Sequence, residues 1–262
     1  MSEYILLGSI GAVAGLLAGL FGIGGAVVIV PALIFSFELS GMGPESAKFA
    51  IGTSMAAIIF TGLSSSFTHY KKNAIDFEAL YAIAPFIVIG TLIGSDLAGK
   101  IESPLLKRYF GFLEIAVAVM MFFRLPEREE RGVSAIWRWV VYVIGGLLIG
   151  TISSLLGIAG GTLSVPLLVL LLHRRTQIAV GTSSAIGVII AFFGTIGFIV
   201  QGRQFLSDIT FGYVMPQTAL LIGIVGALTA PIGAIVSHRI DTLILSRVFA
   251  FFLMGIGILL IL

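Results

Sequence analysis

Apolar residues along the chain form eight long segments that are separated by short polar or charged stretches. They cover residues 4–37, 49–68, 77–98, 105–123, 137–172, 178–200, 209–236 and 243–262. A helix that crosses the hydrocarbon core of a bilayer once needs about 20 predominantly apolar residues. Most of the segments are close to that length, and we predict one membrane-spanning helix for each of these.

The first and fifth segments are too long for a single crossing, because each would measure about 50 Å as one continuous helix. Each contains a glycine cluster that ends in proline: GIGGAVVIVP at 22–31 and GIAGGTLSVP at 157–166. We predict a break at each cluster, which divides the segment into two helices or a re-entrant hairpin. Pro31 and Pro166 then either begin the second helix or kink it.

The glycine clusters are part of a longer internal repeat. Each is followed by a Gly-Thr-Ser triplet, at 52–54 and at 181–183, and residues 94–101 resemble residues 233–240. We therefore predict two homologous membrane repeats, residues 1–123 and residues 137–262. The charged stretch 124–136 joins them as a linker, because charges of that density do not lie in hydrocarbon.

Composition supports an all-α polytopic membrane protein. Hydrophobic residues make up 58% of the chain and charged residues only 11%, whereas soluble domains carry about 25% charged residues. The net charge of +2 is too small to suggest a nucleic-acid partner. The chain has no cysteine, which excludes disulfides, thiolate metal sites and thiol redox carriers.

The distribution of the 15 Lys and Arg residues indicates how the repeats are related. If each long segment crosses once, these residues divide seven to eight between the two sides of the membrane. If each long segment enters and returns, they divide ten to five. The positive-inside rule favours the second topology, with a cytoplasmic linker and both termini outside. The odd number of crossings then makes the repeats inverted, as in many transporters.

The broken helices are candidate binding elements. Free N–H groups at the start of a helix attract anions, and glycine lets the backbone approach a ligand closely. We predict one central anion site, lined by Gly22, Gly24, Gly25, Thr53, Ser54, Gly157, Gly160, Gly161, Thr162, Thr182 and Ser183. The alternative is purely structural, because small residues pack helices together in membranes and helical hydroxyls bond to the preceding turn. Gly90 and Gly94 have the spacing of such a packing contact.

Three charged residues within or beside the apolar segments are candidates for coupling or gating. Glu114 lies mid-segment, where it either relays a proton or pairs with Arg108. Asp96 stands four residues before Lys100, which favours an ion pair over a coupling role. Lys48 either guides anions towards the site or extends its ammonium group to the membrane surface.

The paired G-x-G-G-x4-V-P pattern, the Gly-Thr-Ser triplets and the basic stretches near Lys71 and Arg239 resemble the sulfite exporter TauE/SafE family of membrane permeases. The resemblance covers essentially the whole chain. It implies movement of sulfite, sulfonates or related small anions across the cytoplasmic membrane of a bacterium or archaeon. Ala26 and Ala159 stand where this family commonly has glycine, and we expect their methyl groups to narrow the site.

The predicted function is therefore a secondary transporter that moves a small anion by alternating access, with protons as the candidate coupling ion. An anion channel and an accessory membrane subunit without flux of its own are the alternatives. A membrane-embedded serine hydrolase would need a histidine at the depth of Ser54 or Ser183, and none lies there. The histidines lack metal-ligand spacing. We predict no enzyme activity, metal or cofactor, and leave the oligomeric state open.

Overall fold

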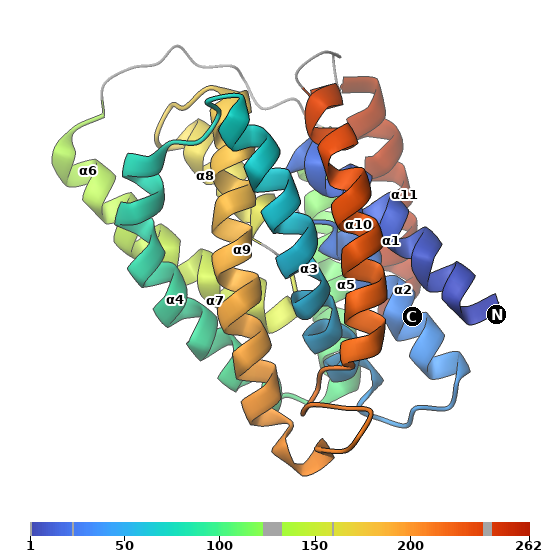
Figure 1. Ribbon diagram of the computed structural model, residues 1–262. Coiled ribbons are helices and arrows are strands. Elements are labelled where there is room, and N and C mark those ends of the chain that lie inside the picture. The colour runs from blue at the N-terminus through green and yellow to red at the C-terminus, as the bar shows by residue number, and fades with distance from the viewer. Residues whose placement is uncertain (1, 23, 123–132, 159, 238–242) are drawn as a thin grey trace.

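The computed structural model describes residues 2–22, 24–122, 133–158, 160–237 and 243–262, and the regular elements in this part of the chain are helices joined by short loops (Figure 1). A single bridge pairs Phe211 with Val214. The helices are α1 (Ser2–Phe21), α2 (Ala26–Leu39), α3 (Ser46–Lys71), α4 (Phe77–Lys100), α5 (Ser103–Phe122), α6 (Ala135–Val140), α7 (Gly146–Leu156), α8 (Gly161–Leu170), α9 (Thr176–Gln201), α10 (Pro216–Ser237) and α11 (Leu243–Ile261). A π-helical stretch, Val141–Gly145, connects α6 to α7, and a 3-10 turn, Arg203–Phe205, follows α9.

Six helical stretches in the described residues are long and apolar enough to cross a membrane. They are Tyr4–Phe21, Ser46–Lys71, Phe77–Lys100, Ala135–Leu156, Thr176–Gln201 and Pro216–Ser237. Helices α2 and α8 are apolar but shorter, as is the stretch Phe249–Ile261. The prediction of an all-α polytopic membrane protein is confirmed. Two of the predicted crossings are short return helices, because the glycine clusters interrupt the long segments.

Both predicted helix breaks are present. Helix α1 ends at Phe21 and α2 begins at Ala26, while α7 ends at Leu156 and α8 begins at Gly161. The breaks contain glycines with positive φ, including +68° at Gly22 and +76° at Gly157. Side chains disfavour this left-handed conformation, so glycine is needed where the chain turns.

The two prolines that follow the glycine clusters lie inside the second helix of each pair. Each of them, Pro31 in α2 and Pro166 in α8, is the sixth residue of its helix. Neither proline begins its helix, and the left-handed glycines alone make the break. This settles a choice that the sequence leaves open.

Two predicted segment boundaries need correction. The seventh segment was expected to start at residue 209, but α10 begins at Pro216, because residues 206–215 fold back as a loop. Pro216 suits a first helical turn, where its missing N–H costs no hydrogen bond. The predicted linker, 124–136, lies largely outside the described residues, and α6 begins within it at Ala135.

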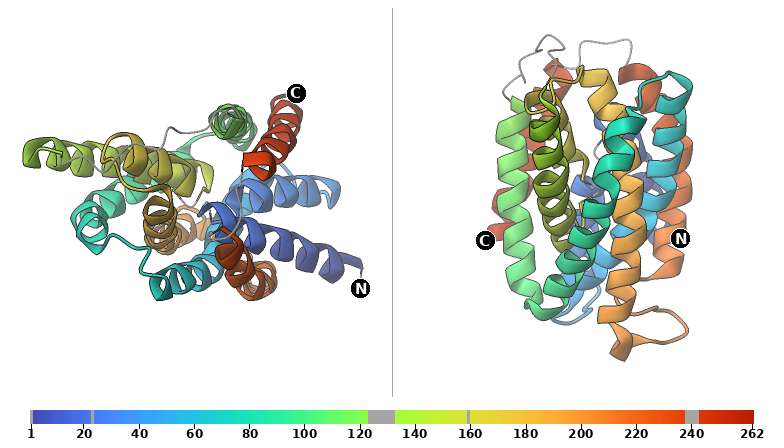
Figure 2. Two further views of the ribbon diagram at one scale, coloured as in Figure 1. Left: turned by 90° about the horizontal axis from the view of Figure 1, so that it is seen from above. Right: turned by 90° about the vertical axis from the view of Figure 1, so that its left-hand side faces the viewer.

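Helices α3 and α9 pack against each other and run in opposite directions (Figure 1). Helix α1 packs on α10 and α7 packs on α4, while the short helices α2 and α8 lie against α3 and α9. Helices α5 and α11 lie side by side, on the side of the molecule away from α3 and α10 (Figure 2). The two breaks therefore lie inside the bundle, beside the α3–α9 pair.

Glycine allows the closest of these helix contacts. A Cβ at Gly94 of α4 would collide with the carbonyl oxygen of Thr151 in α7, and one at Gly15 of α1 would collide with that of Gly226 in α10. The predicted packing role of Gly90 and Gly94 is confirmed, since a Cβ at Gly90 would also strike α7, at Leu147. Close backbone approach through small residues is the usual way in which helices associate in membranes.

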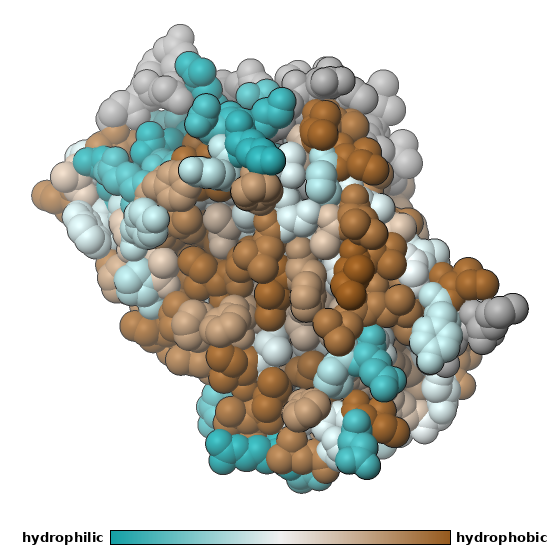
Figure 3. Space-filling view, viewed as in Figure 1, coloured by the Kyte–Doolittle hydropathy of each residue, from teal (hydrophilic) through white to brown (hydrophobic). Residues whose placement is uncertain are grey.

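The face of the molecule shown in Figure 3 is brown and apolar across its middle, with polar residues gathered towards its upper and lower ends. Large apolar side chains are exposed on the membrane-spanning helices, among them Leu228, Phe192 and Ile224. An apolar surface of this extent is unusual for a soluble monomer and fits contact with lipid.

Candidate functional site at the two helix breaks

Hydroxyl groups hold the first break, between α1 and α2. The Ser183 hydroxyl of α9 donates to the carbonyl oxygen of Gly22 (3.1 Å), and the Thr61 hydroxyl of α3 donates to that of Gly24 (3.3 Å). The Ser65 hydroxyl reaches the carbonyl oxygen of Ala18 (3.5 Å). A helix that ends inside a bundle must have its last carbonyls satisfied, and here the neighbouring helices satisfy them.

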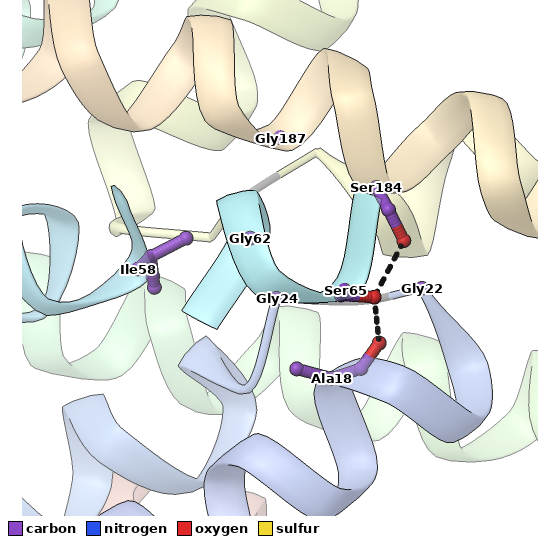
Figure 4. A pocket seen from close by; sticks show the side chains of 8 residues that line it. All are labelled: Ala18, Gly22, Gly24, Ile58, Gly62, Ser65, Ser184 and Gly187. Carbon is purple, nitrogen blue, oxygen red and sulfur yellow. Dashed lines mark hydrogen bonds between the residues drawn. The ribbon is translucent and has the colours of Figure 1, made fainter. Parts of the chain in front are cut away.

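A narrow pocket adjoins this break (Figure 4). It is lined by Ala18, Gly22, Gly24, Ile58, Gly62, Ser65, Ser184 and Gly187. The empty space, including the open mouth, totals about 180 Å³, and no part of it is wide enough to hold the centre of a water molecule. The hydroxyl oxygens of Ser65 and Ser184 are 3.2 Å apart inside it. The pocket is therefore too narrow for a water molecule in this structure.

The predicted glycine Gly22 is held tightly beside this pocket. A Cβ added there would lie 2.6 Å from the carbonyl oxygen of Val180 and 2.7 Å from the Ser183 hydroxyl. Gly25 is similarly close to α1, since a Cβ would lie 2.6 Å from the carbonyl oxygen of Ala14. Both positions therefore demand glycine for space as well as for backbone conformation.

The second break, between α7 and α8, lies against α3. A Cβ on Gly157 would lie 2.9 Å from Cγ2 of Ile51 and 3.2 Å from Cγ2 of Val30 in α2. Gly160 is in contact with Ile190 of α9, and Gly161 begins α8. The contact with Val30 joins the second break to the first broken helix, so both breaks belong to one central region.

Neither short helix has a side-chain cap. Gly25 precedes α2 and Gly160 precedes α8, and both are left-handed, with φ of +79° and +68°. Amide groups at the start of α2 and α8 are therefore left without a side-chain partner, which is the condition for attracting an anion.

Within the central region, the predicted residues form two groups. Gly22 lies against Val180 and Ser183, near the start of α9, and Gly157 lies against Ile51, near the start of α3. Because α3 and α9 are antiparallel, these two groups lie towards opposite ends of the pair. The methyl group of Ala26 is fully buried at the start of α2. Ile23 and Ala159 lie outside the described residues.

The two predicted threonines bind backbone amides of loops. The Thr53 hydroxyl accepts a hydrogen bond from the Met215 N–H (3.1 Å), just before α10. The Thr182 hydroxyl accepts one from the Asp76 N–H (2.9 Å), just before α4. Their neighbours Gly52 and Gly181 let the same loops approach closely. The structure therefore places Thr53 and Thr182 at the loops before α10 and α4, where they anchor these segments.

Several hydroxyl-bearing and small residues of the central region were not predicted. Ser65, Gly62 and Gly187 line the pocket beside Gly22, and Ser153, Ser154 and Ser164 flank the second break. Only Ser153 and Ser154 carried a signal, since the matching positions of the first repeat are Ala18 and Gly19.

Two of the charged candidates form contacts at the end of the bundle where α3 begins. The Lys48 ammonium pairs with Glu45 (3.0 Å) and donates to the carbonyl oxygen of Gly99 (3.2 Å). Asp96 pairs with Lys100 (2.6 Å), as predicted, and accepts a hydrogen bond from Gln201 (2.8 Å).

Lys48 also lies over the ring of Tyr213, 5.5 Å from its centre. Burial and the neighbouring Glu45 carboxylate raise the pKa of Tyr213 to about 12. The phenol of Tyr213 therefore stays protonated at physiological pH.

Glu114 is fully buried in α5. A Cβ on Gly257 of α11 would lie 3.2 Å from Cβ of Glu114, so the carboxylate lies beside α11. Neither carboxylate oxygen has a hydrogen-bond partner in the described part of the chain. The alternative pairing with Arg108 is therefore not formed, and Arg108 is exposed.

Comparisons with known proteins place this geometry in a family context. Residues 7–260 match the family model described as Sulfite exporter TauE/SafE. A probable membrane transporter protein of Haemophilus influenzae is 33% identical over 253 residues, covering 95% of this chain and 94% of that protein. A probable membrane transporter protein of Methanocaldococcus jannaschii is 29% identical, covering 90% and 87%. No solved structure matches the chain significantly.

Proposed function

Because the chain belongs to the sulfite exporter TauE/SafE family, we propose that it is a secondary transporter that moves a small anion across the cytoplasmic membrane. Sulfite, sulfonates and related organic or sulfur-containing anions are the candidate cargo. The observation that carries the proposal is the pair of helices broken at left-handed glycines beside α3 and α9. Matching broken helices in two halves of a membrane protein mark transport sites.

Inverted repeats and alternating access are part of this proposal. The helix contacts of the two halves correspond, since α1 packs on α10 as α7 packs on α4. The loop anchors correspond in the same way: Thr53 holds the segment before α10, and Thr182 holds the segment before α4. This exchange of roles supports a two-fold relation, in which one half rocks against the other around the breaks.

The neutral lining of the breaks supports an anion that is bound and then released. Uncapped amides at the starts of α2 and α8 provide a positive potential, and hydroxyls supply donors. The pocket of Figure 4 has no charged side chain in its lining. A fixed cation would hold a divalent oxyanion more strongly, which would slow its release.

We assign the charged candidates to separate tasks. The contacts of Lys48 and Asp96 close the bundle where α3 begins and α9 ends, so we propose that they stabilise a closed gate. Glu114 is buried without a hydrogen-bond partner among the described residues, and we propose that it carries a coupling proton. The excess of basic residues on the linker side supports a cytoplasmic linker and external termini.

The test is transport by the purified chain in lipid vesicles, with sulfite, sulfate, thiosulfate, sulfonates and acetate as trial substrates. A carrier gives saturable uptake and counterflow. An anion channel gives ohmic current instead, and an accessory subunit gives no flux with any of these anions. Either of the last two results would contradict the proposal.

A further inference from the structure

Five buried hydroxyl groups near the second break have no hydrogen-bond partner among the described residues. They belong to Ser54 of α3, Ser153 and Ser154 of α7, and Thr162 and Ser164 of α8. Thr162 is 6% exposed and the other four are fully buried. A buried hydroxyl without a partner costs about 1–3 kcal/mol. Five such hydroxyls near one break therefore call for an explanation.

The five residues that carry these hydroxyls lie beside the break, on the three helices next to it. Ser153 and Ser154 are in the last turn of α7, and Thr162 and Ser164 are in the first turn of α8. The Ser164 hydroxyl lies 3.5 Å from the position of a Cβ on Gly160. Ser54 follows Ile51 by one turn on the same face of α3, and Ile51 is the residue in contact with Gly157.

Several hydroxyls at the first break and in α9 are paired, although those of Ser66 in α3 and Thr91 in α4 also lack a partner among the described residues. At the first break, those of Ser183 and Thr61 donate to the carbonyl oxygens of Gly22 and Gly24. Ser184 and Thr195 of α9 bond to carbonyls of their own helix, which is the usual arrangement when no other partner is near. The hydroxyls around the second break form neither kind of bond, so they are available as donors.

Four of these hydroxyls occur in the second repeat alone, whereas Ser54 belongs to the first repeat and has Ser183 as its counterpart. Residues 153–157 read SSLLG, and the matching residues 18–22 read AGLFG. Thr162 and Ser164 correspond to Val27 and Ile29. The duplicated fold therefore does not require hydroxyls at these four positions, since the first break is built without them.

We propose that these five hydroxyls form the binding site for the oxygen atoms of the transported anion, at the start of α8. This assignment rests on the proposed transport function and deepens it. The uncapped amides of the ten-residue helix α8 supply the positive potential, and the hydroxyls supply directed donors. Such a site selects small anions with several oxygen acceptors, such as sulfite or sulfate, over chloride.

The experiment compares thermal unfolding of the purified full chain with and without sulfite, sulfate or chloride at matched ionic strength. The variants are Ser153→Ala, Thr162→Val, Ser164→Ala and the triple combination. Without anion, each single variant should be as stable as the unchanged protein or more stable, because it removes an unpaired polar group. Each should weaken sulfite binding about tenfold, or about 1.4 kcal/mol, and the triple variant should show no shift.

Two controls separate binding from folding. Ser95→Ala in α4 removes a buried hydroxyl that bonds to the carbonyl oxygen of Leu92, so it should lower stability and leave the anion shift intact. Thr162→Ser keeps the hydroxyl and should keep the affinity.

The outcomes distinguish this site from the function on which it rests. A triple variant that binds sulfite and sulfate as tightly as the unchanged protein overturns the site, while transport by that variant leaves the proposed function standing. An unchanged protein that neither shifts nor transports any of these anions overturns both.

Discussion

Gly22 meets two requirements at the first break. Its φ of +68° is strained for any residue with a side chain, and a Cβ would lie 2.6 Å from the carbonyl oxygen of Val180. Because Gly22 has no side chain, it permits both the left-handed backbone and the close approach to α9. Gly157 repeats the same combination against Ile51 of α3. The left-handed glycines, rather than Pro31 and Pro166, lie where the long apolar segments break.

We expect Gly22→Ala to reduce the free energy of unfolding by about 2–4 kcal/mol, from left-handed strain together with the clash on α9. Thermal unfolding of the purified protein measures the change. Gly8→Ala is the matched control in the same chain region, because nothing lies within 4 Å of a Cβ there. If the two variants were equally stable, position 22 would not require glycine, contrary to this prediction.

Glu114 supports a second prediction for a single residue. Because neither of its oxygens has a hydrogen-bond partner in the part of the chain that the structure describes, Glu114→Gln should leave the folded state as stable as before or more stable. In vesicles, uptake driven by a proton gradient should be lost, while counterflow of the anion should persist. Proton-driven uptake that survives in this variant would remove Glu114 from the coupling mechanism.

At the scale of elements, the Gly-Thr pairs connect helices that are far apart in sequence. Gly52 and Thr53 of α3 receive the loop before α10, and Gly181 and Thr182 of α9 receive the loop before α4. Each loop is thereby fixed to the helix that packs at the centre of the bundle. If one half rocks against the other, each loop either moves together with the helix that binds it or loses its hydrogen bond to the threonine.

Thr53→Val and Thr182→Val should each lower the free energy of unfolding by about 1–3 kcal/mol, because each leaves a loop amide unpaired. Hydrogen exchange should accelerate at Met215 in the first variant and at Asp76 in the second. Thr→Ser at either position retains the acceptor and serves as the control. If the valine variants lose anion affinity without losing stability, the threonines are ligands rather than anchors.

At the scale of the whole molecule, the chain offers a clean test of its orientation, since it has no cysteine. Lys72 follows α3 and Arg203 follows α9, so they lie at opposite ends of the bundle, and both are exposed. In intact cells, a membrane-impermeant maleimide should label Arg203→Cys but leave Lys72→Cys unlabelled until the membrane is opened. The reverse pattern would place the linker outside.

The helices and their breaks were largely predictable because the information is local. A segment too long for one crossing, with clustered glycines inside it, has few other solutions, and α2 and α8 begin close to where the pattern suggests. The predicted start of α10 was wrong because residues 209–215 contain apolar side chains that are buried in a loop and not in a helix. Tyr213 in that stretch is buried against the aromatic rings of Phe49 and Phe205 rather than in a helix.

The candidate site was only partly predictable. Gly22 and Gly24 do line a pocket, and Ser54 and Thr162 lie at the second break with unpaired hydroxyls. Thr53 and Thr182 are also hydroxyl-bearing residues of the repeated Gly-Thr-Ser motif. Their hydroxyls nevertheless accept hydrogen bonds from loop amides. The motif itself contains no information on which backbone amide lies opposite each hydroxyl, because that amide belongs to a loop more than a hundred residues away in the sequence.

The sequence by itself determined the membrane class and the places where two helices break, and it predicts two repeats. These follow from hydropathy, segment length and the backbone freedom of glycine, all of which act within a few neighbouring residues. Only the tertiary structure decided which hydroxyls are used for folding and which are left without partners. Hydrogen bonding of a buried hydroxyl depends on distances between segments that meet only after the chain has folded. The structure shows that hydroxyls at the first break are paired, whereas those beside the second break have no partner among the described residues.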